Sequence, residues 1–322
     1  MGDFELAVRG VSKRFGRTVA LDNVSFNFSR GVNLLLGANG SGKSTLINIL
    51  AGLTYPDRGV LVVDDSEYSS ARRGDWLAGV RSLAPSLGVL AEKPGFPLWY
   101  TGRELLHSTL RAAGLPAKSE WVEWVLDELG LTSSIDRRIR EYSSGMMQKL
   151  GVAVSLAVEP RLVLWDEPTA NLDAASRRIV VELMDKMRKK GTTFIVASHI
   201  PVDFEGKADW VGLLELGRVV WSGHPEAFQS PSTRVYVTCT NTHDSRELGS
   251  LILRMGLSTE VSVEGNRVLL MLGVDSLLDQ SLEGVKEGVL EAARGLGVEV
   301  VDFRIAPNTI SELYYNLLRI NR

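Results

Sequence analysis

Residues 37–44 form a glycine-rich loop of the pattern GxxxxGK[ST], which binds phosphate groups. An apolar run at 32–36 precedes the loop, and residues 45–50 after it read as a helix. In this setting several backbone N–H groups can point at one phosphate, and the helix N-terminus adds partial positive charge. We expect Lys43 to reach the terminal phosphates and the Ser44 hydroxyl to bind Mg²⁺. The alternative is an ordinary glycine-rich turn, which the flanking strand and helix disfavour. The residues expected to hold the phosphates are Gly37, Ala38, Asn39, Gly40, Ser41, Gly42, Lys43, Ser44 and Thr45.

Two acidic residues follow a second apolar run. Residues 162–165 read as a buried strand, and Asp166 and Glu167 stand at its carboxyl end. Ligands bind at this end of the parallel strands in α/β folds. We expect Asp166 to hold Mg²⁺, usually through water, and Glu167 to orient or deprotonate an attacking water. An acid pair after an apolar strand is common by itself, so this expectation depends on the phosphate loop upstream.

A turn of small residues lies between these two motifs. Residues 142–149 read Tyr-Ser-Ser-Gly-Met-Met-Gln-Lys and precede an apolar helix that begins near Leu150. Such a turn at a helix N-terminus is a second place where an anion can bind. The alternative is an ordinary helix N-cap, in which Ser143 or Ser144 bonds to the backbone without any ligand. The residues by themselves leave both interpretations open.

The elements that must position these groups alternate between strands and helices, which predicts an α/β fold with a parallel core. Residues 4–30 have the pattern of paired antiparallel strands, and a helical insert is expected at about 94–145. We place the end of this first domain near residue 230. The other expected elements are a strand at 59–63, helices at 101–113, 119–129, 135–140, 147–157 and 174–190, a strand at 193–197 and a hairpin at 210–222.

A second, smaller domain is predicted for residues 231–322. The expected elements are a strand at 235–239, a helix at 244–255, strands at 259–264 and 267–274 with a tight turn at 265–266, a helix at 282–296 and a strand at 298–305. This βαββαβ order is the ferredoxin-like pattern, a small α+β fold. A closing helix is expected at 308–320.

The composition is that of a globular protein. The 322 residues are 44% hydrophobic and carry a formal net charge of −3, so no nucleic-acid partner is expected. The single cysteine, Cys239, excludes an intramolecular disulfide and favours a reducing compartment. The N-terminus shows no signal-peptide pattern, and no apolar run approaches the ~20 residues that span a bilayer. If the protein acts at a membrane, another chain must span it.

The order of the motifs resembles the ATP-binding cassette (ABC) ATPase family over residues 4 to about 228. The resemblance implies a P-loop NTPase core with an N-terminal antiparallel β subdomain, hydrolysis of ATP, and Mg²⁺ as a cofactor. Residues 142–146 are similar to the family signature LSGGQ, with Ser144 and Met146 replacing the first glycine and the glutamine. In the family, the signature serine and second glycine contact the γ-phosphate bound by the opposite subunit. That role would fall on Ser143 and Gly145.

Four further positions match motifs of the family. Asp173 matches the D-loop, which crosses the dimer interface, and His199 matches the switch histidine, which senses the γ-phosphate. Phe15 matches the aromatic residue that stacks on adenine. Glu92 stands where the family has the glutamine of its Q-loop, and its carboxylate would approach Mg²⁺ or the attacking water. Without the resemblance, His199 reads as a structural histidine and Phe15 as a packing contact in a hairpin.

Within the family, the chain resembles the branch of ATPase subunits of drug, antibiotic and similar exporters. This resemblance implies that two copies form a head-to-tail homodimer around two ATP molecules and act on a separately encoded transmembrane permease. The chain would then lie in the cytoplasm, peripherally attached to the inner face of the cell membrane. The aromatic stretch in 94–105 would receive a helix of the permease, although core packing explains the same residues. The alternatives are the ATPase subunit of an ABC importer, or a soluble ABC ATPase that acts on ribosomes or DNA.

Overall fold

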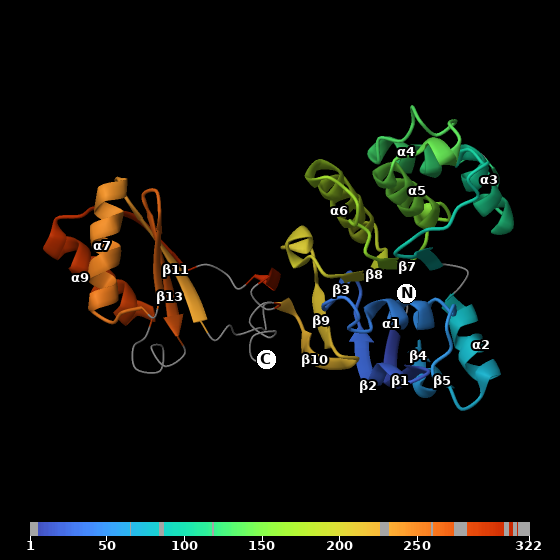
Figure 1. The fold of residues 1–322 in the computed structure, drawn as a ribbon, viewed down its shortest axis with the longest axis horizontal. Coiled ribbons are helices and arrows are strands. Elements are labelled where there is room, and N and C mark those ends of the chain that lie inside the picture. Colours follow the sequence, from blue (N-terminus) through green and yellow to red (C-terminus); the bar gives the residue numbers. More distant parts are fainter. Residues whose placement is uncertain are drawn as a thin grey trace. The chain divides into compact units, whose positions relative to one another are not determined.

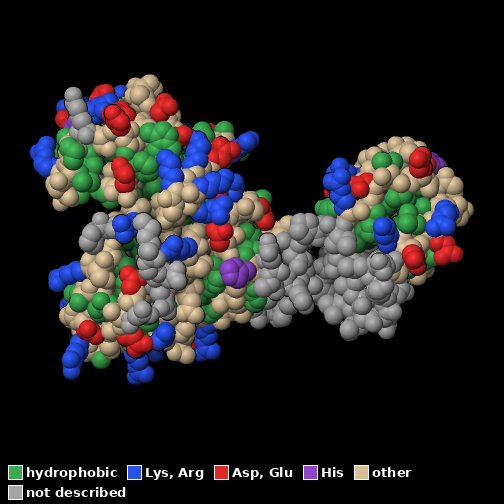
Figure 2. Space-filling model, turned by 180° about the vertical axis from the view of Figure 1, so that it is seen from behind, with side chains coloured by type: hydrophobic (Ala, Val, Ile, Leu, Met, Phe, Trp, Pro, Cys, Tyr) green, Lys and Arg blue, Asp and Glu red, His purple; other side chains and the backbone are tan. Residues whose placement is uncertain are grey.

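The computed structural model describes residues 6–64, 66–83, 87–117, 119–225, 232–258, 260–273, 282–305, 309–311 and 314 (Figure 1). The chain divides into two compact units, Met1–Pro225 and Glu226–Arg322. Basic and acidic side chains are interspersed over the face of each unit that Figure 2 draws. Among the described residues, no helix combines the length and the apolar composition that would cross a bilayer.

A six-stranded sheet forms the centre of the first unit, in the order β10-β9-β3-β8-β7-β6. Neighbouring strands from β9 to β6 are parallel, and β10 pairs antiparallel with β9 at the edge. Every residue of β3, β7 and β8 is buried, because parallel strands are covered on both faces. The parallel α/β core that the sequence predicted is confirmed. The strand bounds are β3 Val32–Leu36, β6 Leu87–Leu90, β7 Leu162–Asp166, β8 Thr193–Ser198, β9 Trp210–Glu215 and β10 Arg218–Gly223.

A second sheet is antiparallel and has the order β2-β1-β4-β5. One helix separates it from the six-stranded sheet. Helix α1 (Lys43–Leu50) lies between the two sheets in Figure 1 and contacts β2, β7 and β8. Its buried side chains join both sheets in one apolar core. Because α1 begins at Lys43, this packing fixes the phosphate loop at the carboxyl end of β3. The bounds are β1 Leu6–Phe15, β2 Thr18–Phe28, β4 Arg58–Val63, β5 Ser66–Ser69 and, for the covering helix, α2 Arg73–Leu83.

Four helices lie on the side of the six-stranded sheet opposite to α1 (Figure 1). They are α3 (Gly102–Ala112), α4 (Glu120–Glu128), α5 (Ser144–Leu156) and α6 (Ala174–Lys189). Side-chain oxygens cap the N-termini of all four, from Thr101, Ser119, Ser143 and Asp173. Helix α5 contacts each of the other three helices and strand β6, so it links the helical insert to the six-stranded sheet.

The helix predicted at 135–140 is wrong. Residues there form turns that end in a short 3₁₀ helix, Ile139–Glu141. The amide of Ile139 donates to the Tyr100 carbonyl at 2.8 Å, and that of Arg140 donates to the Leu98 carbonyl at 3.1 Å. An α-helix needs these amides for bonds four residues back, so the pairing with the 98–100 segment replaces it.

The described part of the second unit has a four-stranded antiparallel sheet of order β12-β13-β11-β14 and the helices α7 and α9. The β12–β13 hairpin turns at Gly265 and Asn266, where Gly265 has a φ of 60°. A separate apolar core lies between the helices and the sheet. Most of the closing helix predicted at 308–320 lies outside the described residues. The bounds are β11 Ser232–Cys239, α7 Thr242–Arg254, β12 Glu260–Glu264, β13 Arg267–Gly273, α9 Leu282–Leu296 and β14 Val300–Ile305.

Candidate active site

The phosphate loop joins β3 to α1 and is held by close backbone approaches. A Cβ atom on Gly37 would lie 2.4 Å from the Leu214 carbonyl oxygen. At Gly42 the φ is 109°, and a Cβ atom would lie 2.5 Å from the Ala20 carbonyl oxygen. Only glycine fits at both positions, so the loop keeps a path that turns its amides inward. The buried Ser41 hydroxyl has no hydrogen-bond partner in the described part of the chain, which leaves a polar atom available for a phosphate.

Lys43 lies folded over the phosphate loop. Its ammonium donates to the carbonyl oxygens of Gly37 and Ala38 at 2.7 and 3.2 Å, and lies 3.9 Å from the Glu167 carboxylate. Burial lowers the pKa of Lys43, and the negative charges of Glu167, Asp166 and Glu92 oppose that shift. These charges favour an ammonium whose position suits it to the terminal phosphates of a nucleotide.

Asp166 ends β7 and is paired with the phosphate loop through Ser44. Burial raises the pKa of Asp166 to about 6; the Ser44 hydrogen bond opposes this shift, and the charges of Glu167 and Glu92 add to it. Its Oδ1 atom is buried without a hydrogen-bond partner among the described residues. A buried carboxylate oxygen without a donor, next to a hydroxyl, is the ligand set that a hard cation such as Mg²⁺ prefers. The residues present therefore fit the metal that the sequence predicted.

No three His, Cys, Asp or Glu side chains gather into a metal cage in the ranges that the structure describes. Mg²⁺ at nucleotide sites is bound by one or two protein side chains together with substrate phosphates and water. The pair of Ser44 and Asp166 matches that pattern.

Glu167 is the next residue, and its backbone is strained. It has a φ of 51°, unusual for a non-glycine residue, and its amide donates to the Ala197 carbonyl at 2.9 Å. One oxygen of its carboxylate lies 2.8 Å from His199 Nδ1. The carboxylate thus stands between the His199 imidazole and the Lys43 ammonium, where the structure brings three predicted residues together.

Glu92 and Phe15 lie on other elements. Glu92 follows β6 and is exposed, and its charge raises the pKa values of both Lys43 and Asp166. Its charge therefore acts on the residues expected to hold the phosphates and the metal, and its role as a metal ligand stays a prediction. Phe15 ends β1, is 52% exposed, and has the Lys13 ammonium 5.3 Å from its ring centroid. Its stacking on adenine stays a prediction.

The signature and D-loop residues serve as helix caps within their own chain. The Ser143 hydroxyl accepts from the Met146 amide at 3.2 Å, and the Asp173 carboxylate accepts from the Ser176 amide at 2.7 Å. A Cβ atom on Gly145 would lie 3.4 Å from the Asn171 carbonyl oxygen. The two motifs are therefore packed together, and both Ser143 and Asp173 are exposed. No hydrogen bond or ion pair in the described ranges joins them to the phosphate loop of the same chain.

Three residues around the Glu167 loop were missed by the sequence reasoning. The buried Gln148 side chain donates to the carbonyl oxygens of Glu167 and Pro168 at 3.0 and 3.3 Å. The Thr169 hydroxyl donates to Asp203 at 2.7 Å. Gln148 carried a signal, because it lies within the 142–149 segment that the sequence already indicates as a possible anion site. Thr169 and Asp203 carried none, since 34 residues separate them in the sequence.

Known proteins share this motif order and fold. A sequence profile of the ABC transporter family matches residues 21–170. Nod factor export ATP-binding protein I of Rhizobium sp. (strain N33) is 32% identical over 267 residues, which cover 82% of this chain and 85% of that protein. The chain belongs to the ABC transporter family. The daunorubicin resistance ATP-binding protein DrrA3 of Streptomyces coeruleorubidus is 27% identical to this ABC ATPase, over 98% of the chain and 96% of that protein.

Solved structures agree with this assignment. An ATP-binding subunit of an ABC transporter superposes on this ABC ATPase with a TM-score of 0.59 at 27% identity, over 68% of this chain and 89% of that one. A dimeric bacterial ABC cassette has a TM-score of 0.62 at 22% identity, over 69% and 100% of the two chains, which shows the shared fold. The prediction of an ATP-hydrolysing ABC subunit that resembles the exporter branch is confirmed.

Proposed function

We propose that two copies of this ABC ATPase form a head-to-tail homodimer with two ATP molecules at the interface. Each site would combine the phosphate loop of one copy with Ser143 and Gly145 of the other. The supporting observation is that the signature turn packs against Asn171, while Ser143 and Asp173 are both exposed. The N-terminus of α5, which carries Ser143, offers partial positive charge to a partner's γ-phosphate.

Within each site, different residues of the chain would bind the phosphates, bind the metal and accept the proton. Lys43 and the loop amides would hold the phosphates and offset the negative charge that develops during transfer. Ser44 and Asp166, with Glu92 nearby, would hold Mg²⁺, which adds positive charge at the transferred group. Glu167 would orient the attacking water and accept its proton, because its carboxylate is held at a fixed angle beside the metal ligands.

His199 would report the state of the γ-phosphate. It is the exposed partner of the Glu167 carboxylate at 2.8 Å, so a change on the phosphate side can alter this contact. ATP would bind the closed dimer better than the open one, and hydrolysis with loss of phosphate would release the closed state.

The closing and opening of the dimer would move a separate transmembrane permease, with the ATPase on the cytoplasmic side of the membrane. Leu98 and Trp99 are 52% and 69% exposed at the start of the helical insert, within the 94–105 stretch. Exposed apolar side chains of this size suit contact with a helix of the permease. The permease would choose the cargo.

The domain division and the fold of the C-terminal part also belong to this proposal. We assign residues 1–230 to the nucleotide-binding domain and 231–322 to a ferredoxin-like accessory domain. The strand order β14-β11-β13-β12, with helices after β11 and β13, supports that assignment. DrrA3, a relative named for daunorubicin resistance, aligns through the same C-terminal region.

Mixing two inactive variants tests the composite site. Lys43→Ala removes the phosphate lysine, and Gly145→Asp places a carboxylate on the signature turn, where a Cβ atom is tolerated at 3.4 Å from Asn171. In a mixed dimer one site carries both defects, while the other combines Lys43 of one chain with Gly145 of its partner. We expect mixtures to recover about a quarter of wild-type hydrolysis if sites act independently. Mixtures as inactive as each variant alone would show that the site lies within one chain.

A further inference from the structure

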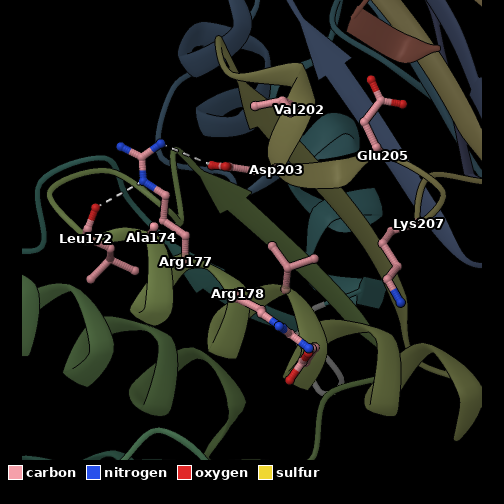
Figure 3. Close-up of a pocket in the computed structure, with 10 residues that line it drawn as sticks. Leu172, Ala174, Arg177, Arg178, Val202, Asp203, Glu205 and Lys207 are labelled. Carbon is pink, nitrogen blue, oxygen red and sulfur yellow. Dashed lines mark hydrogen bonds and ion pairs between the residues drawn. The ribbon is translucent and has the colours of Figure 1, made fainter. Parts of the chain in front are cut away.

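A cleft of 570 Å³ lies between the start of α6 and the 3₁₀ helix η3 (Pro201–Phe204). Figure 3 shows Arg177 of α6 reaching across it toward Asp203 of η3, with Leu172 on the other side of the guanidinium. None of the residues that line this cleft is among those assigned above to the phosphates or to Mg²⁺.

A chain of polar contacts runs through this cleft. The Thr169 hydroxyl donates to Asp203 Oδ2 at 2.7 Å, and the same carboxylate oxygen lies 3.6 Å from an Arg177 guanidinium nitrogen. Arg177 Nε in turn donates to the Leu172 carbonyl oxygen at 3.0 Å. Thr169 is fully buried, and the side chains of Asp203 and Arg177 are 11% and 32% exposed. Contacts of this burial hold defined geometry better than exposed surface pairs do.

Arg177 lies on α6, and the three residues that these contacts join to it follow or precede different functional residues. Thr169 stands two residues after Glu167, and Asp203 stands four residues after His199. Leu172 immediately precedes Asp173 in the D-loop. The Thr169–Asp203–Arg177 contacts therefore tie the catalytic-base loop, the switch-histidine loop and the D-loop to one another within a single chain.

We propose that Asp203 and Arg177 are positioning residues that set the D-loop according to the Glu167–His199 arrangement. Neither touches the reacting atoms; they act through Thr169 and the Leu172 carbonyl. A shift of the histidine loop moves Asp203, and through Arg177 it moves the D-loop that faces the partner subunit. This inference rests on the proposed dimer, because there the D-loop reaches the second ATP site.

The test compares neighbouring arginines of α6. Arg177→Ala breaks the contact chain, whereas Arg178→Ala removes only an ion pair to Glu182 at the surface, with the Arg178 side chain 81% exposed. We expect Arg177→Ala and Asp203→Asn to lower kcat by about 10- to 100-fold through misplaced loops, with ATP affinity within about twofold of wild type. The Hill coefficient for ATP should also fall toward one, and Arg178→Ala should match wild type in all three measurements.

A double-variant cycle separates coupling from general damage. If Asp203 and Arg177 act as one unit, Arg177→Ala with Asp203→Asn should lower kcat no further than either change alone. Multiplying effects, a kcat for Arg177→Ala equal to that for Arg178→Ala, or parallel loss of ATP affinity and thermal stability would each overturn the proposal. Failure of the coupling leaves the Lys43→Ala and Gly145→Asp complementation intact. Failure of the composite dimer removes that complementation whatever Arg177 does.

Discussion

Replacing Glu167 with glutamine probes the proposed base with little change of shape. The carboxylate lies 2.8 Å from His199 Nδ1 and 3.9 Å from Lys43 Nζ, and its side chain is 10% exposed. Glutamine has the same size and still offers an oxygen and an amide for hydrogen bonding, but it cannot accept a proton at neutral pH. The backbone contact to Ala197 and the Gln148 bonds do not involve the side chain, so they persist.

The size of the effect follows from the lost proton transfer. A positioned general base contributes about 10²- to 10⁴-fold, so Glu167→Gln should raise the barrier by about 3–5.5 kcal/mol. ATP binding should remain, because the phosphate contacts come from the loop and Lys43. Glu167 is also the largest of the charges that raise the Lys43 pKa, so its removal lowers that pKa further. The negative charge of the bound phosphates opposes this shift of the Lys43 pKa.

Phosphate release and size-exclusion chromatography in the presence of MgATP measure both parts of this prediction. The variant should turn over at most about a hundredth as fast as wild type and should accumulate as a dimer with unhydrolysed ATP. Glu182→Gln, at an exposed ion pair on α6, is the matched control and should behave as wild type. Turnover within about threefold of wild type would remove Glu167 from the role of base. Loss of ATP binding together with turnover would show that its charge serves the phosphate loop instead.

Three further predictions concern binding, stability and partner contact. Lys43→Ala should abolish ATP binding measured by calorimetry, since the buried ammonium already spans the loop; unchanged affinity would contradict the phosphate-loop assignment. Asp185, 8% exposed, accepts from Lys189, Arg188 and Lys207, which together hold its pKa below the ordinary value. Its stabilising effect is therefore present above the unfolded pKa of about 4 and lost as pH falls below it. Asp185→Asn should cost about 1.5–3 kcal/mol of unfolding free energy at pH 7 in urea melts, and a cost independent of pH between 3 and 7 would refute this account. Trp99→Ser should reduce co-purification with the membrane partner while leaving hydrolysis by the isolated ATPase unchanged; unchanged co-purification would exclude this surface.

The sequence predicted the phosphate loop and the acid pair because each depends on a short, contiguous pattern. Glycines at 37, 40 and 42, a lysine and the flanking apolar runs specify a strand–loop–helix unit without reference to distant residues. The strand before Asp166 was equally clear, since a fully buried parallel strand reads as a continuous apolar run.

Other elements depended on distant partners and were missed or wrong. The 135–140 segment has helix-compatible residues, but its amides pair with the 98–100 segment. Strand β6 is only four residues long and contains Gly88, so it gives a weak strand signal. Helix α2 contains two glycines, and the tertiary burial of Trp76 helps to hold it. The contacts of Asp203 arise only where three loops meet, which no local pattern encodes.

The burial of the site explains why acidic and basic groups lie close together in it. Burial raises the Asp166 pKa to about 6, because ionisation leaves a negative charge in a poorly solvated place. Burial also lowers the pKa of Lys43, and the nearby charges of Glu167 and Asp166 raise it. Burying either charge alone is therefore unfavourable in free energy, and a nearby opposite charge offsets that cost. A divalent cation beside Asp166 and a phosphate beside Lys43 supply the missing charges together, so we expect nucleotide and metal to bind to this loop as a pair.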